Sequence, residues 1–183
     1  MDSGARIATL EGHKQPVLSL AFSPDGAAIV STGADGSVRL WDAATGEMQR
    51  QLALGVAGQM VAFSPDGAQI AAQGERIVKV WEADSGDEVA TLEHGALVAG
   101  MAFSPDGAIA TASFDGAVRV WDLASGEIAA TLLPEAAGAQ PLGLAYSLDG
   151  TVLAVGRAAG DTLDLLDAQT GEVAGASVQI GDP

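Results

Sequence analysis

The residues of this sequence that could do chemistry are few and widely spaced. Only two histidines are present, His13 and His94, and there is no cysteine. A general base or a metal site needs several such groups to converge on one place. Neither a G-x-S-x-G nucleophile motif nor a G-x-x-x-x-G-K phosphate motif occurs. We therefore predict a protein that is not an enzyme, with no catalytic residue, no cofactor and no metal site.

The acidic residues recur in a short turn sequence. FSPDG occupies residues 22–26, 63–67 and 103–107, and YSLDG occupies 146–150. Each copy carries one aspartate, whereas a calcium loop spaces several carboxylates two residues apart. Serine first, proline second and glycine fourth are typical of a type I turn. We interpret these acids as turn residues.

The overall charge and hydropathy exclude two classes of partner. The formal net charge is -16, from 24 acidic and 8 basic residues, so the surface repels a phosphate backbone. No apolar run is long enough to cross a bilayer, and the first residues do not resemble a signal peptide. We predict a cytoplasmic protein that binds neither nucleic acid nor membrane.

The turn sequence marks a repeat that spans nearly the whole chain. Successive copies begin 41, 40 and 43 residues apart, and an aromatic–acid pair follows at 41–42, 81–82 and 121–122, with Leu166 and Asp167 in the fourth place. A repeat of this length that carries Trp-Asp is typical of a four-stranded propeller blade. The strands of such blades are the elements that would position any functional site.

The first repeat divides into strands at 17–23, 27–32, 37–42 and 47–54, with an Asp35-Gly36 hairpin turn. No helical periodicity persists, so the fold class is all-β. The first two strands are apolar on both faces, which suits a sheet stacked between other sheets. We predict a β-propeller of four-stranded antiparallel blades, with four blades in this chain.

The predicted domain covers residues 5–183. Its blades lie at about 13–54, 55–93, 94–133 and 138–180, and residues 5–12 form an extra outer strand. Four blades describe only about half of a seven- or eight-bladed ring. The apolar faces at the two ends can be covered in three ways: a tight four-bladed ring, a homodimer that completes an eight-bladed ring, or a longer parent protein of which this chain is a fragment.

The stretch GHKQPVLSLAFSPDGAAIVSTGADGSVRLWD, residues 12–42, resembles the WD-repeat β-propeller family. The resemblance implies a buried structural tetrad of histidine, hydroxyl residue, aspartate and tryptophan in each blade. In the first and third repeats the matching residues are His13, Ser31, Asp35 and Trp41, and His94, Thr111, Asp115 and Trp121. The second repeat has Ala72 and Glu75 at the hydroxyl and aspartate positions, and the fourth has Leu166 in place of the indole.

The resemblance also implies a protein or peptide partner bound on one rim of the propeller. By position, the candidate rim consists of Pro16, Leu18, Ala34, Ala57, Gln59, Gly74, Leu97, Ala99, Phe114, Gln140 and Leu142. Phe114 stands out because an aromatic in a hairpin turn either anchors a partner or packs on the next blade. Both interpretations stay open at this point.

These observations favour a non-enzymatic scaffold for protein–protein interaction. One alternative is a propeller enzyme with its active site at the channel mouth, which would need several ionisable side chains on the rim. Another is a fragment whose function resides in the rest of a larger regulatory protein.

Overall fold

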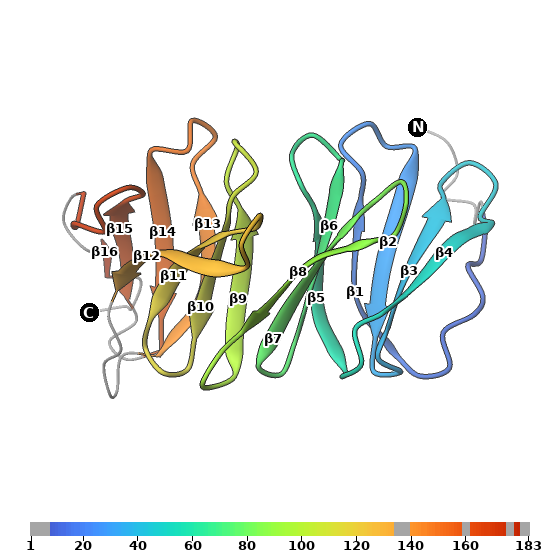
Figure 1. Cartoon of the computed structure of the whole chain (residues 1–183), viewed down its shortest axis with the longest axis horizontal. Helices are drawn as coiled ribbons and strands as arrows, with labels where there is room; N and C mark the ends of the chain where they lie inside the picture. Colours follow the sequence, from blue (N-terminus) through green and yellow to red (C-terminus); the bar gives the residue numbers. More distant parts are fainter. Residues whose placement is uncertain (1–7, 134–139, 159–161, 175–177, 180–183) are drawn as a thin grey trace.

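The computed structural model describes residues 8–133, 140–158, 162–174 and 178–179. Every regular element in these residues is a β-strand, and sixteen strands form four antiparallel sheets of four strands each (Figure 1). The prediction of an all-β fold built from four-stranded blades is confirmed.

The strands of each sheet pair in the order in which they occur in the chain. Sheet one contains β1 (Val17–Phe22), β2 (Ala28–Gly33), β3 (Ser37–Asp42) and β4 (Met48–Ala53). Sheet two contains β5 (Gly58–Phe63), β6 (Gln69–Gly74), β7 (Ile77–Glu82) and β8 (Glu88–Glu93). Sheet three contains β9 (Val98–Phe103), β10 (Ile109–Ser113), β11 (Val118–Asp122) and β12 (Glu127–Leu133). Sheet four contains β13 (Pro141–Tyr146), β14 (Val152–Arg157), β15 (Thr162–Asp167) and β16 (Val178–Gln179).

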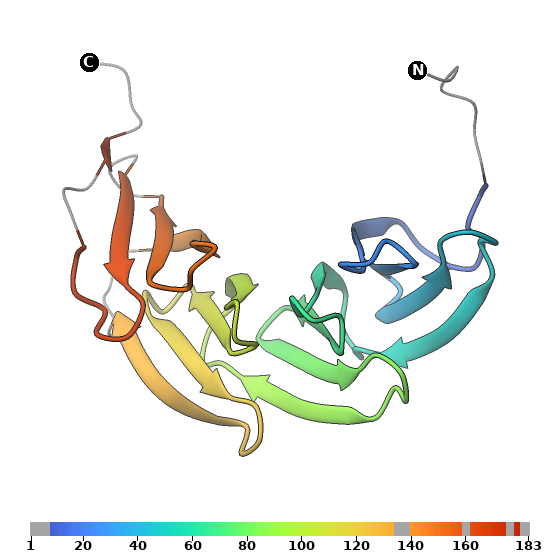
Figure 2. The same cartoon turned by 90° about the horizontal axis from the view of Figure 1, so that it is seen from above.

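The four sheets stand side by side in an open arc (Figure 2). The first strand of each sheet lies toward the concave side, and the outer strands β4, β8 and β12 lie on the convex side. The first strands approach one another closely because small residues separate them: a Cβ added at Gly100 would lie 3.1 Å from the Cα of Gly143. The arc has the form of half a ring.

The hydrophobic core lies between the sheets. Val30 and Leu40 of sheet one pack with Ile70 and Trp81 of sheet two in one cluster of buried side chains. Similar clusters join sheet two to sheet three and sheet three to sheet four. Each inner sheet is therefore covered on both faces, which explains why its strands are apolar on both sides.

The repeated pentapeptide forms the same turn between the first and second strands. In the first copy, the Gly26 N–H donates to the Ser23 carbonyl at 2.9 Å, and the Ser23 hydroxyl donates to the Asp25 carboxylate at 2.6 Å. Gly26 has a φ of +73°, a conformation that favours glycine. The other three copies make the corresponding serine–aspartate bond, so the aspartates act within their own turns.

The extra outer strand expected at residues 5–12 is not formed in its described part. Residues 8–12 lie in no strand, and residues 5–7 lie outside the described residues. A strand needs a neighbouring strand to bond with, and sheet one is already complete with β1 to β4. Whether this segment adds to another sheet stays a prediction.

Candidate functional site

Four side chains of sheet one form a continuous chain of hydrogen bonds. The Trp41 indole Nε1 donates to the Ser31 hydroxyl at 2.8 Å, and this hydroxyl lies 2.8 Å from His13 Nε2. His13 Nδ1 lies 3.1 Å from both oxygens of Asp35. These hydrogen bonds join strands β2 and β3 to the segment that precedes β1 and to the β2–β3 hairpin, so they hold that end of sheet one in one geometry.

Asp35 is the most heavily bonded member of this network. Its carboxylate accepts bonds from the Lys14 N–H at 2.9 Å and from the Ser37 hydroxyl at 2.8 Å, and Arg39 Nη2 lies 3.8 Å away. Its side chain is 8% exposed. Burial alone would raise the pKa of Asp35, but the hydrogen bonds from Lys14, Ser37 and His13 together hold it well below its usual range. The carboxylate is therefore charged at neutral pH.

Sheet three contains the corresponding residues in a different arrangement. Trp121 Nε1 donates to the Thr111 hydroxyl at 2.7 Å, which lies 2.8 Å from His94 Nε2. His94 Nδ1, however, donates to the Leu92 carbonyl at 3.2 Å, and Asp115 instead pairs with Arg119 at 2.9 Å. The expected link between His94 and Asp115 is thus replaced by an Asp115–Arg119 pair and a bond from His94 to a backbone carbonyl.

Sheets two and four fill the corresponding positions with apolar side chains. In sheet two Ala72, which has no hydroxyl, is fully buried beside the buried Trp81. In sheet four Leu166 occupies the indole position and is fully buried with Leu153 and Val155. Glu75, the only acid near the aspartate position of sheet two, is exposed in a hairpin and has a φ of +33°. At these positions sheets one and three therefore have hydrogen-bonded side chains, and sheets two and four have apolar ones.

The geometry of the tetrads suits support rather than catalysis. The side chain of His13 is 6% exposed and His94 is 9% exposed as a residue. Both nitrogens of each ring are already engaged by the protein. Among the described residues, no group of three or more histidine, cysteine, aspartate or glutamate side chains could hold a metal ion.

The stability of sheet three should depend on the protonation of His94. Burial, followed by the positive charge of Arg119, lowers the pKa of His94 from its ordinary value of 6.5. The unfolded chain therefore binds a proton more readily than the folded chain, and the free energy of unfolding should fall as the pH drops below about 6.5. Urea titrations between about pH 7 and pH 5 should show this loss.

The His94→Gln variant is the control for this effect, because glutamine does not titrate. Adding His13→Gln to this variant would remove both histidines of the chain. We expect His94→Gln to flatten the dependence on pH in this interval. An unchanged slope would show that other groups are responsible.

The candidate rim lies along the edge of the sheets at which the first strand of each sheet begins. Most of its residues reach the surface: Leu18 is 52% exposed, Leu142 54% and Leu97 44%. Pro16, Gln59 and Gln140 are exposed, and Ala34, Ala57 and Ala99 are half-buried. Gly74 is an exception because it is buried, and a Cβ there would lie 2.6 Å from Val56.

The position of Gly74 follows from a shorter hairpin. In sheet two only Glu75 and Arg76 separate β6 from β7, whereas three residues separate β2 from β3 in sheet one. Counting residues along the repeat therefore places Gly74 on the rim, whereas Gly74 is the buried last residue of β6. Glu75 and Arg76, both exposed, occupy the tip of this hairpin.

Phe114 and Leu97 form the most prominent apolar pair of the rim. The Phe114 N–H donates to the Leu97 carbonyl at 2.8 Å, which places the two residues next to each other. Phe114 is 39% exposed and lies outside the clusters of buried side chains formed by the described residues. The ring therefore does not pack in these clusters, and its role as an anchor for a partner stays a prediction.

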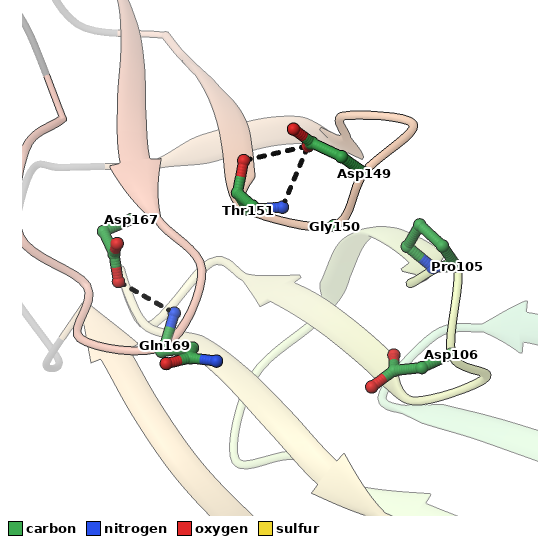
Figure 3. Close-up of a pocket in the computed structure, with 7 residues that line it drawn as sticks. All are labelled: Pro105, Asp106, Asp149, Gly150, Thr151, Asp167 and Gln169. Atoms are coloured by element: carbon green, nitrogen blue, oxygen red, sulfur yellow. Dashed lines mark hydrogen bonds between the residues drawn. The ribbon is translucent and has the colours of Figure 1, made fainter.

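On the opposite edge of the sheets, adjacent turns form an acidic pocket. A pocket of about 360 Å³ between sheets three and four is lined by Asp106, Asp149 and Asp167, among others (Figure 3). The Ser147 hydroxyl and the N–H and hydroxyl of Thr151 donate to Asp149 and lower its pKa to about 2. Bonds from Thr170 lower the pKa of Asp167 as well. The sequence shows these acids as separate turns and gives no sign that adjacent turns share a pocket.

Four-stranded antiparallel sheets that stack side by side around an arc define a propeller-type protein. Residues 4–42 and 86–122 match the family model described as "WD domain, G-beta repeat". The second match extends from β8 of sheet two to β11 of sheet three, so the family's repeat unit straddles two sheets. Two stretches of the chain are thus similar to the WD-repeat family model.

Parts of the chain are similar to proteins of several organisms. A WD repeat-containing protein of Synechocystis is 46% identical over 69 residues, which cover 36% of this chain and 20% of the relative. Eukaryotic translation initiation factor 3 subunit I of Aspergillus terreus is 38% identical over 74 residues, 40% of this chain and 22% of the relative. The same subunit of Emericella nidulans is 35% identical over the same shares. The matched regions thus span about a fifth of these relatives' length.

The described residues contain no helix that is long and apolar enough to cross a membrane.

Proposed function

We propose that this chain is a non-enzymatic scaffold that binds a protein or peptide on its rim, in the cytoplasm. The observation that carries the proposal is the group of exposed apolar side chains at one end of the first strands: Leu18, Leu97, Phe114 and Leu142. Exposed aromatic and aliphatic side chains on a rigid surface are typical anchors for a partner. The matches to the WD-repeat family model and the similarity to a protein named as a subunit of a translation initiation factor agree with such a role.

The predicted rim residues that reach the surface are alanine, leucine, proline, glutamine and phenylalanine, which cannot transfer protons at neutral pH. The β6–β7 hairpin adds one exposed acid and one exposed base, Glu75 and Arg76. The two histidines of the chain serve in the tetrads. The same features argue against the propeller enzyme considered from the sequence. The strands that present the rim are held by packing between sheets, so a partner would dock on a preformed surface with little ordering cost.

Replacing Phe114 by alanine should weaken partner capture and leave stability nearly unchanged. An exposed anchor contributes its contacts only in the complex, so we expect at least about a tenfold loss of bound partner. The immobilised chain is incubated with cell extract, and proteins that it retains are quantified by mass spectrometry. Leu97→Ala should reduce the same proteins.

The matched control is Ile128→Ala, because Ile128 is 47% exposed but lies on the outer strand β12 of the same sheet. This variant should retain the partner at the level of the original chain. Equal losses in both variants would indicate non-specific adhesion. A large fall in the melting temperature of Phe114→Ala would assign the ring to the structural core.

A further inference from the structure

Each sheet has two faces that can be distinguished by what covers them. We call the face that packs on the preceding sheet the front face and the other the rear face. In sheet two the front face includes Val61, Ile70 and Trp81, which pack on the rear face of sheet one. In sheet three Met101, Ile109 and Trp121 occupy the same places against sheet two. Three such junctions join the four sheets, so within the described part of the chain no sheet covers the front face of sheet one or the rear face of sheet four.

The front face of sheet one has the composition of a junction, and its first strand is exposed, although Trp41 is only 2% exposed and Leu10 and His13 also line this face. Leu20 occupies the place of Val61 and Met101 and is 63% exposed, against 4% and 6% for those residues. Val17, in the place of Val98, is 48% exposed against 3%. Ile29 and Trp41 repeat the isoleucine and tryptophan of sheets two and three. Together with Leu20 they line an apolar hollow of about 220 Å³.

The rear face of sheet four shows the same contrast. Ala154 pairs with Leu165 in the register in which Ala71 pairs with Val80. Ala71 and Val80 are fully buried, whereas Ala154 and Leu165 are half-buried. Leu163 occupies the place of the fully buried Val78 and Val118, and it is half-buried beside an apolar hollow of about 290 Å³ that Ala154 also lines.

We propose that two copies of this chain join end to end, the front face of sheet one of each copy covering the rear face of sheet four of the other, to close a ring of eight sheets. Both halves of the junction are present in every copy, and each open face repeats residue types that already pack together inside the chain. Two identical contacts of this head-to-tail kind close when the rotation between copies completes a circle. The half-ring shape and the open faces at its two ends meet that condition (Figure 2).

Burial of these faces supplies the driving force. Exposed apolar side chains such as Leu20 and Val17 gain free energy in proportion to the area removed from water. The formal charge of -16 on each copy opposes the association. Added salt screens this repulsion, so the paired form should become tighter as ionic strength rises. This pairing is a property beyond the proposed scaffold function, and the closed ring would carry the candidate rim residues of both copies.

The mass of the chain in solution tests the proposal. Light scattering on a size-exclusion column should give twice 18.2 kDa. Leu20→Asp should reduce the mass to that of one copy, and Leu20→Lys should do the same despite its opposite charge. Ile128→Asp is the matched control, since it adds the same charge at a similarly exposed side chain on β12, and it should keep the doubled mass. Circular dichroism checks that each variant is folded.

A mixing experiment distinguishes ring closure from general adhesion. Leu20→Asp damages the front face and Leu163→Asp the rear face, so each variant alone has two damaged junctions in any ring. A mixture of the two can form a pair with one intact junction, and we expect a doubled mass to reappear at higher concentration. A single-copy mass for the original chain, an open-ended series of larger masses, or a doubled mass that Leu20→Asp does not change would overturn the proposal.

Discussion

Replacing Asp35 by alanine is expected to lower the free energy of unfolding by about 3 kcal/mol or more. The substitution removes the acceptor for the Lys14 N–H, the Ser37 hydroxyl and His13. It also leaves the Arg39 guanidinium, whose side chain is only 5% exposed, without the carboxylate 3.8 Å away. Buried donors and a buried charge that lose their partner cost far more than the net value of the bonds. Denaturation in urea, followed by tryptophan fluorescence, measures the change.

The matched control is Asp25→Ala. Asp25 is also an aspartate in a turn and accepts bonds from Ser23 and Ala27, but it is exposed, so water can replace it. We expect a clearly smaller loss there. Similar losses for the two variants would mean that the Asp35 network contributes no more than an ordinary turn.

Replacing Trp121 by alanine is expected to cost about 3–5 kcal/mol. The indole fills the junction between sheets two and three together with Ile109 and Met101, and its ring centre lies 5.0 Å from that of His94. Its removal therefore leaves a cavity and also deprives the Thr111 hydroxyl of a donor. Because neighbouring sheets depend on this junction, the loss should be visible in the cooperative transition of the chain.

Phenylalanine at positions 121 and 81 separates the two contributions. Trp121→Phe removes the indole N–H that reaches Thr111, whereas Trp81→Phe removes an indole in a sheet whose corresponding position is Ala72, which has no hydroxyl. Both variants lose similar apolar volume. We therefore expect Trp121→Phe to be more destabilising by about 1 kcal/mol, the value of a typical hydrogen bond. Equal effects would show that packing alone accounts for the role of the tryptophans.

The fold was largely predictable because its signals are local and repeated. The pentapeptide turn, the Asp35-Gly36 hairpin and the Trp-Asp pairs each fix one part of a blade, and forty-residue spacing places them in register. The apolar strands predicted stacking, and the junctions at Ile70 and Ile109 show it. What this pattern could not determine is which side chain a given polar group selects.

Asp115 illustrates that limit. By spacing it corresponds to Asp35, yet it pairs with Arg119 while His94 donates to a backbone carbonyl. Arg39 stands at the corresponding place in sheet one, but there the carboxylate bonds to His13 as well. Both sheets carry an arginine four residues after the aspartate, so the spacing of residue types does not determine which partner the carboxylate takes. Gly74 shows the same limit for the rim, since a hairpin one residue shorter moved it into the buried end of a strand.

The row of lateral junctions also determines how the molecule comes apart. Each of the two middle sheets is held from both sides, whereas each terminal sheet is held from one. Local opening in such an array begins where a unit has a single neighbour and proceeds inward. The chain therefore has a built-in gradient of hydrogen-exchange protection, lowest at its extremities and highest at its centre, and any partner that caps the extremities would level that gradient.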